Sequence, residues 1–159
     1  MWGLFAAVAW ATPTVELAYQ GESVFRPGLR AAVVWSATDE GLHLRPAIAI
    51  GGWHQPGHST LLSTGPAASA LYVAGSGALE LTAGLELWTA IRAAPTYTAA
   101  AELLPRQVEL GVMPRFGGAL HLGVGRLRPF VRQHVAFRAP SSALGSLHLL
   151  TELGVGFTP

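Results

Sequence analysis

The alternation of hydrophobic and polar positions is most regular between Gly77 and Arg92. Leucine and other apolar residues occupy the odd positions of this stretch, and the even positions carry two glutamates and the final arginine. A repeat of two residues is the side-chain period of a β-strand, whereas a helix would scatter the leucines around its circumference. The stretch also exceeds the about 9–11 residues that a tilted strand needs to cross a bilayer. The pattern therefore predicts a membrane-crossing strand with an aliphatic face toward lipid and a charged face toward a lumen.

Similar alternating segments lie on both sides of this stretch, and together they predict eight strands. The predicted strands are residues 14–19, 28–36, 42–53, 68–73, 77–92, 107–116, 119–137 and 146–157. The seventh segment changes parity between Arg126 and Pro129, which indicates a bulge within one long strand or two separate strands. Pro46 interrupts the third segment, and a further bulge is expected there.

The connections between the predicted strands alternate in length. Longer loops are expected at residues 20–27, 54–67, 93–106 and 138–145, and tight turns at 37–41, 74–77 and 116–118. Within the third loop, the run Ala-Ala-Ala-Glu-Leu-Leu has the composition of a single helical turn. Long loops at one rim and tight turns at the other are typical of outer-membrane barrels.

The composition agrees with a membrane barrel. Of the 159 residues, 50% are hydrophobic and only 12% are charged, against about 25% charged residues in typical soluble domains. No apolar run reaches the roughly 18 residues of a transmembrane helix. The chain has no cysteine, which excludes disulfides and thiolate metal sites. The net charge is +1 and the basic residues, all arginine, are spread along the chain, so no nucleic-acid-binding patch is expected.

The first eleven residues have the character of a short signal peptide. They form an apolar stretch that ends in the small-x-small pattern Ala9-Trp10-Ala11, although no basic residue precedes it. A first strand is the alternative interpretation. The sequence therefore predicts a signal peptide at residues 1–11 and a single β-barrel domain at residues 12–159, exported across the inner membrane of a bacterium.

The chain ends with an alternating segment, Leu147–Phe157, that resembles the closing strand of small bacterial outer-membrane β-barrel proteins. The segment Arg126–Val131, Arg-Leu-Arg-Pro-Phe-Val, also resembles sequence segments of barrels of this class. The closing strand of the class ends in an aromatic residue that the insertion machinery reads; here Phe157 is followed by Thr158 and Pro159. The resemblance implies an all-β, antiparallel, up-and-down transmembrane barrel in the bacterial outer membrane, and it implies little about activity.

Two alternatives to the eight-stranded membrane barrel remain at this stage. One is a barrel of ten strands. The other is a soluble, lipocalin-like barrel that binds an apolar small ligand. In that case the two faces of the segment from Gly77 to Arg92 would exchange, with leucines enclosed and glutamates in water.

The inward face of the predicted barrel carries five carboxylates and five guanidinium groups. By parity they are Glu16, Arg30, Arg45, Glu80, Glu86, Glu109, Arg115, Arg132, Arg138 and Glu152. The interior of an eight-stranded barrel is just wide enough to be filled by side chains, and charges enclosed there must be paired. We expect a structural charge network that largely fills the lumen, with a polar path for small solutes as the alternative.

The histidines are candidates for metal binding or for filling the lumen. His54 and His58 have the spacing of a metal-ligand pair but lie in a loop rich in glycine and proline. His43, His121 and His148 face inward by parity, and we expect them to serve as polar filler. The sequence therefore predicts neither a bound metal nor a cofactor.

Some outer-membrane barrels hydrolyse lipids, and lipid A deacylases of this size use a His-x-Ser pair with a carboxylate. Here His134 is followed by valine and alanine, so that serine is missing; a triad of His134, Ser141 and Glu152 is the remaining arrangement. We expect a non-enzymatic barrel with a structural or surface-interaction role, embedded in the lipid bilayer. Loops 54–67 and 93–106 would contact a surface partner.

Overall fold

The computed structural model describes residues 12–21, 27–36, 41–55, 59–92, 96–97, 103–104, 108–123, 126–139 and 146–159. The predicted signal peptide, residues 1–11, lies outside this part of the chain. The described strands are β1 (Thr12–Gly21), β2 (Pro27–Ser36), β3 (Gly41–Gln55), β4 (Ser59–Ala74), β5 (Gly77–Arg92), β6 (Thr96–Tyr97), β7 (Leu103–Leu104), β8 (Val108–Leu122), β9 (Leu127–Arg138) and β10 (Ser146–Phe157).

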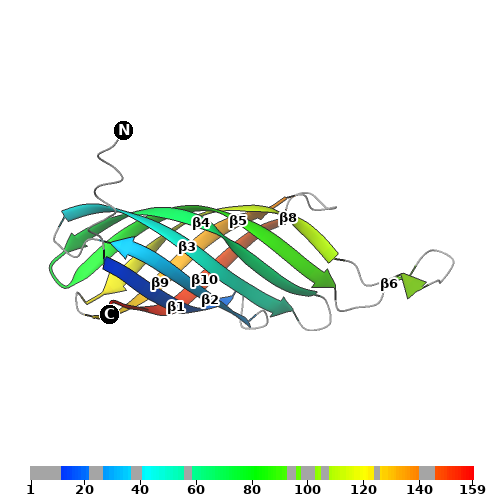
Figure 1. The fold of residues 1–159 in the computed structure, drawn as a ribbon, viewed down its shortest axis with the longest axis horizontal. Helices are drawn as coiled ribbons and strands as arrows, with labels where there is room; N and C mark the ends of the chain where they lie inside the picture. Colours follow the sequence, from blue (N-terminus) through cyan, green and yellow to red (C-terminus); the bar gives the residue numbers. More distant parts are fainter. Residues whose placement is uncertain are drawn as a thin grey trace.

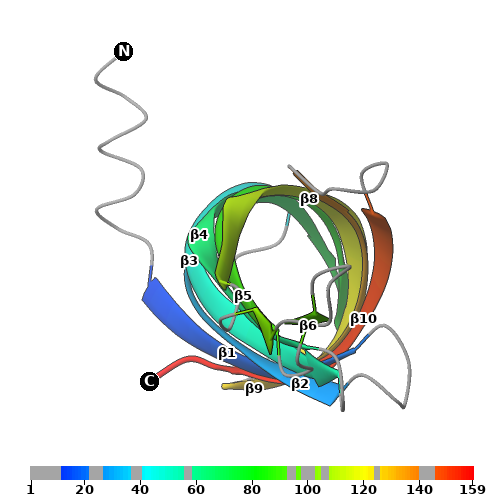
Figure 2. The same ribbon diagram turned by 90° about the vertical axis from the view of Figure 1, so that its right-hand side faces the viewer.

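Eight of these strands close into one barrel, in the order β1-β10-β9-β8-β5-β4-β3-β2 (Figures 1 and 2). Every neighbouring pair is antiparallel, and β10 closes the ring by pairing with β1. The predicted eight-stranded, up-and-down, all-β barrel is confirmed. No helix in the described ranges is long and apolar enough to cross a membrane. The remaining strands, β6 and β7, form a separate two-stranded sheet, so the helical turn expected at the end of that loop is wrong for Leu103 and Leu104.

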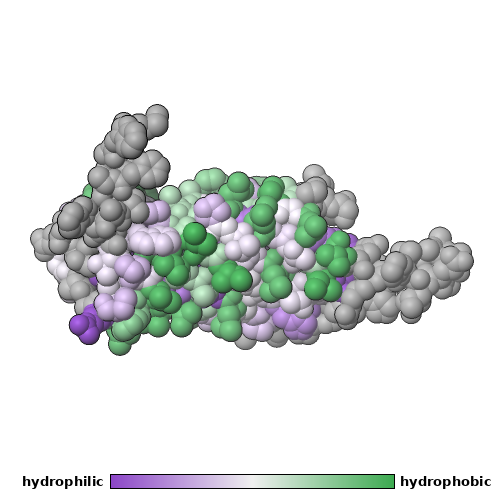
Figure 3. All heavy atoms as spheres, viewed as in Figure 1, coloured by the Kyte–Doolittle hydropathy of each residue, from purple (hydrophilic) through white to green (hydrophobic). Residues whose placement is uncertain are grey.

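The outer wall of the barrel is aliphatic and the inside is charged. Leu79, Leu81 and Leu87 on β5 are 61%, 73% and 64% exposed, whereas Glu80 and Glu86 between them are 4% and 1% exposed. Figure 3 shows hydrophobic side chains gathered over the wall between the two ends of the barrel. A lipocalin-like barrel requires the opposite arrangement, so this alternative is excluded.

The fourth strand is longer than predicted. Residues 59–67 were expected in a loop, because the segment is rich in serine, glycine and proline, but they form the first half of β4. The two-residue period in fact continues through them: Leu61 and Ser63 are buried, while Leu62 and Thr64 are exposed. The predicted loop 54–67 is therefore wrong at residues 54–55 and 59–67, which belong to β3 and β4.

The boundary between the sixth and seventh barrel strands also differs from the prediction. β8 runs straight through Gly117 and Gly118, which were expected to form a turn, and ends at Leu122. β9 begins at Leu127, and Gly123 between the strands has a φ of 81°. The parity change near Arg126 thus arises from a hairpin and not from a bulge. The barrel still has eight strands, because residues 119–122, which were predicted to begin the seventh strand, form the end of the sixth barrel strand, β8.

Prolines within the strands lie where a hydrogen-bond ladder is interrupted. The ladder between β2 and β3 ends at Ala47, next to Pro46. On its other side, β3 pairs with β4 without a break. The bulge expected at Pro46 is therefore wrong. Pro66 lies in a two-residue gap of the β4–β5 ladder. The β8–β9 ladder starts one residue after Pro114 and stops one residue before Pro129. Since proline has no N–H to donate, these gaps let each proline stay in a long strand.

Candidate functional site

The interior of the barrel is built in layers along its axis. An apolar cluster fills the end near the long connections, and consists of Trp53, Leu61, Trp88, Ala90, Met113, Ala136 and Leu150. Two smaller apolar clusters lie toward the opposite end, around Leu71 and Val34. The charged side chains occupy the layer between them. Such layering follows from the strand period, because each strand sends every second side chain into the lumen.

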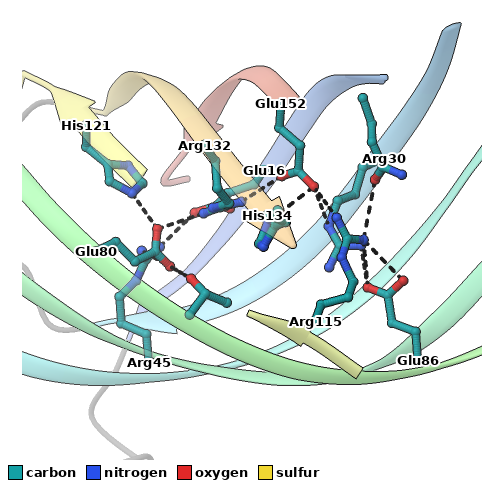
Figure 4. Close-up of polar contacts among 12 residues, drawn as sticks. Glu16, Arg30, Arg45, Glu80, Glu86, Arg115, His121, Arg132, His134 and Glu152 are labelled. Carbon is teal, nitrogen blue, oxygen red and sulfur yellow. Dashed lines mark hydrogen bonds and ion pairs between the residues drawn. The ribbon is translucent and has the colours of Figure 1, made fainter. Parts of the chain in front are cut away.

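Eight of the ten predicted inward charges lie in this middle layer. They are Glu16, Arg30, Arg45, Glu80, Glu86, Arg115, Arg132 and Glu152, each at most 8% exposed. The four carboxylates balance the four guanidinium groups, so the formal net charge of the layer is zero. They come from every barrel strand except β4, and Figure 4 shows them converging on one another across the lumen.

Arg132 joins the two halves of the network. Its guanidinium lies 2.9 Å from Glu16, 2.8 Å from Glu80 and 3.2 Å from Glu152. Arg45 completes the half nearer the tight turns by contacting Glu16 at 2.8 Å and Glu80 at 3.3 Å. The planar fork of arginine can hold several carboxylate oxygens at once, so one guanidinium links carboxylates from three strands.

The other half is centred on Glu86 and Glu152. Arg115 contacts Glu86 at 3.0 Å and Glu152 at 2.8 Å. Arg30 approaches the same two carboxylates at 2.5 and 3.5 Å. Since each carboxylate in this half meets at least two guanidinium groups, the strong cost of enclosing an unpaired charge is avoided.

Two histidines extend the network. His121, which was expected as inward filler, lies with Nε2 2.6 Å from Glu80. His134 is 2% exposed and lies 3.4 Å from Glu152. Two members of the weighed triad are thus neighbours inside the barrel, while Ser141 lies outside the described residues.

Glu109 and Arg138 are placed apart from the main network. They lie near the end of the barrel that carries the long connections, where Glu109 accepts hydrogen bonds from Arg138 at 2.6 Å and from Arg92 at 2.5 Å. This rim cluster carries one carboxylate against two guanidinium groups, and its side chains are 19–38% exposed. Arg138 also stacks on the Trp88 ring, with 4.1 Å from its guanidinium carbon to the ring centroid.

Some interior residues were missing from the predicted set. Arg92 was placed on the lumen-facing side of its strand but was not counted in the network, and Gln20 and His134 share the inward parity of Glu16 and Arg132. Parity alone would have placed them. Of the histidine pair weighed as a metal site, His54 is exposed and its Nδ1 lies 2.9 Å from the Thr60 hydroxyl, while His58 is outside the described residues.

Comparison with solved structures finds the same architecture elsewhere. The N-terminal β-barrel domain of Pseudomonas aeruginosa OprF matches 92% of this chain and 98% of its own, with TM-score 0.59 and 16% identity. Neisserial surface protein A (NspA) matches 92% of each chain, with TM-score 0.55 and 13% identity. The Yersinia pestis outer membrane protein Ail matches 92% and 98%, with TM-score 0.51 and 7% identity.

The fold is that of a small outer-membrane β-barrel. At these identities the likeness concerns the fold alone. No family model matches the sequence, and no curated protein matches it either.

In this outer-membrane-type barrel, the layered interior decides what the lumen can do. Near Arg45 and His121 the lumen keeps a cavity of only about 10 Å³, roughly the space of one water molecule. In the described part of the chain, no group of three or more histidine, cysteine or acidic residues is arranged to hold a metal ion. The arrangement therefore favours a network that holds the strands together over one that binds or conducts a solute.

Proposed function

We propose that the protein is a bacterial outer-membrane barrel with a structural or surface-interaction role and a lumen that conducts no solutes. The observation that carries this proposal is the filled lumen: an ion-paired layer with a large apolar cluster on one side. On the other side lie the smaller apolar clusters around Leu71 and Val34, interspersed with polar side chains such as Thr14 and Arg128. Reconstitution into a planar lipid bilayer tests it. The expected result is the absence of steady single-channel currents from folded protein, and reproducible ohmic channels would overturn the closed lumen.

Bilayer embedding rests on the aliphatic wall. Exposed leucines cover the strands on the outside, and a wall of this kind in water would favour association with any apolar surface. We expect the protein in the outer-membrane fraction, with a gel mobility that shifts when the folded barrel is heated. Recovery of folded protein in the soluble fraction without detergent would contradict this part of the proposal.

The surface role is assigned to the end of the barrel beyond which β6 lies (Figure 1), in the small sheet that it forms with β7. Because residues 59–67 belong to β4, the contact surface proposed is the connection between β5 and β8. Single-cysteine variants test which end faces outward: Tyr97→Cys should react with a membrane-impermeant maleimide on intact cells. Ser76→Cys, at an exposed position in the tight turn between β4 and β5, should react only after the cells are opened. The reverse pattern would contradict the assignment.

A non-enzymatic role is supported by the placement of His134. Its side chain and that of Glu152 are enclosed in the lumen behind the strand wall, whereas a lipid hydrolase needs a base that can reach its substrate. Purified protein in lipid vesicles is expected to release no fatty acid. Release that disappears in His134→Ala would show a hydrolase instead.

A further inference from the structure

A polar pair lies in the aliphatic outer wall, away from its rims. Gln133 of β9 is exposed on the outside of the barrel, and its Oε1 accepts a hydrogen bond of 3.0 Å from the Thr151 hydroxyl of β10. The two residues are direct partners across the β9–β10 ladder. Each stands near the middle of its strand, so the pair lies about halfway between the two ends of the wall.

The outward neighbours of this pair on β8, β9 and β10 are apolar. The outward residues next to it along β9, β10 and β8 are Val131, Val135, Leu149, Leu153, Phe116 and Leu120, all exposed. On β8 the residue paired with Gln133 is Gly118, which offers no side chain to cover the amide. The Gln133 amide is therefore an uncovered hydrogen-bonding group among apolar side chains of β8, β9 and β10.

The amide of Gln133 has more hydrogen-bonding capacity than Thr151 uses. A primary amide carries two donors and a carbonyl acceptor, and among the described residues only the Thr151 hydroxyl is bonded to it. Within the hydrocarbon core neither water nor a lipid head group is available to satisfy the rest, and leaving such groups unpaired is unfavourable. A partner that carries its own donors and acceptors at this depth must therefore be protein.

We infer that this spot is an interface between two copies of this chain in the membrane. An amide is complementary to itself, since two copies related by a two-fold axis can each donate Nε2–H to the other's Oε1. Gly118 lets the two walls approach closely, as small residues do at interfaces within membranes. This inference rests on the bilayer embedding proposed above, and it adds a defined face of the barrel and a defined partner.

Cysteine cross-linking in vesicles of the purified protein tests the interface, because the chain has no cysteine of its own. Val135→Cys places a thiol beside Gln133. Ile48→Cys is the matched control, because β3 lies diametrically across the barrel from β9 and Ile48 is 58% exposed. We expect the disulfide-linked dimer from the first variant only. Adding Gln133→Leu should lower its yield about fivefold, as the loss of two interchain hydrogen bonds in a membrane predicts.

Several outcomes would overturn the inference. They are equal cross-linking at both positions, a yield unchanged by Gln133→Leu, or cross-linking to another protein in native membranes without dimers in vesicles. The heat-dependent mobility shift is recorded for every variant. A barrel that inserts and shifts normally but stays monomeric refutes the dimer alone, whereas a protein that fails to insert refutes the proposed membrane location.

Discussion

Removal of the Arg132 guanidinium should be among the most damaging single changes to this barrel. The group contacts three carboxylates, Glu16, Glu80 and Glu152, at 2.9, 2.8 and 3.2 Å, and is 5% exposed. Arg132→Met keeps much of the volume but leaves the enclosed layer with four carboxylates against three guanidinium groups. Breaking a buried ion pair from one side costs about 3–5 kcal/mol, so we expect a loss of that size in the free energy of unfolding.

The assay is urea unfolding in lipid vesicles, followed by tryptophan fluorescence. With a urea dependence of about 1–3 kcal/mol per molar, the midpoint should fall by at least about 1 M. The matched control is Arg92→Met in the rim cluster. The Arg92 side chain is 38% exposed, and an ion pair this accessible contributes about 1 kcal/mol or less.

A second, charge-balanced variant separates electrostatics from packing. Combining Arg132→Met with Glu16→Gln returns the layer to neutrality, so the double variant should lose at least about 1 kcal/mol less than the sum of the two single losses. Purely additive losses, or a loss for Arg132→Met no larger than for Arg92→Met, would refute the view that charge balance governs the stability of the interior.

Three further changes test other parts of the barrel. Trp88→Phe removes an indole N–H that lies 3.1 and 3.3 Å from two backbone carbonyls, and should lower the free energy of unfolding by about 1–2 kcal/mol; an unchanged urea midpoint would contradict this. Gly111→Ala brings a Cβ within 2.2 Å of the Ala139 carbonyl, whereas at Gly77 the nearest atom is at 3.5 Å, so only the first alanine variant should fail to reach the heat-shifted folded form. Leu81→Arg, on the lipid-facing wall, should cost about 2–4 kcal/mol in vesicles, and an equal stability of variant and parent would show that this wall does not meet hydrocarbon.

Period-two alternation was sufficient to predict the class of fold and the direction of each face. The bounds of β5 were predicted at both ends, and the leucine and glutamate faces of that strand lie as expected. This success has a physical reason: in a barrel whose outside meets lipid and whose inside holds charges, a one-residue register error would place a charge in hydrocarbon. Parity is therefore strictly kept.

The errors arose where glycine and proline were taken as turn signals. Gly117 lies inside β8, where a glycine is needed because a Cβ at this position would lie only 2.5 Å from Nδ1 of His134. Pro66 lies inside β4 because the ladder to β5 is open at that point. In both cases the adjacent strand explains the residue, through a large side chain beside Gly117 and a ladder gap beside Pro66. That information comes from the tertiary arrangement and cannot be read from a local window of sequence.

The position of Glu152 on the final strand has a consequence for how the barrel matures. This carboxylate meets Arg30 from β2, Arg115 from β8 and Arg132 from β9, so three guanidinium groups pair with a carboxylate that is synthesised after all of them. A partly assembled sheet that lacks β10, or that pairs β10 with β1 in the wrong register, retains an excess of guanidinium groups in an apolar environment. Correct pairing of β1 with β10 therefore also neutralises the guanidinium groups in the lumen, so a barrel closed in the wrong register is electrostatically disfavoured.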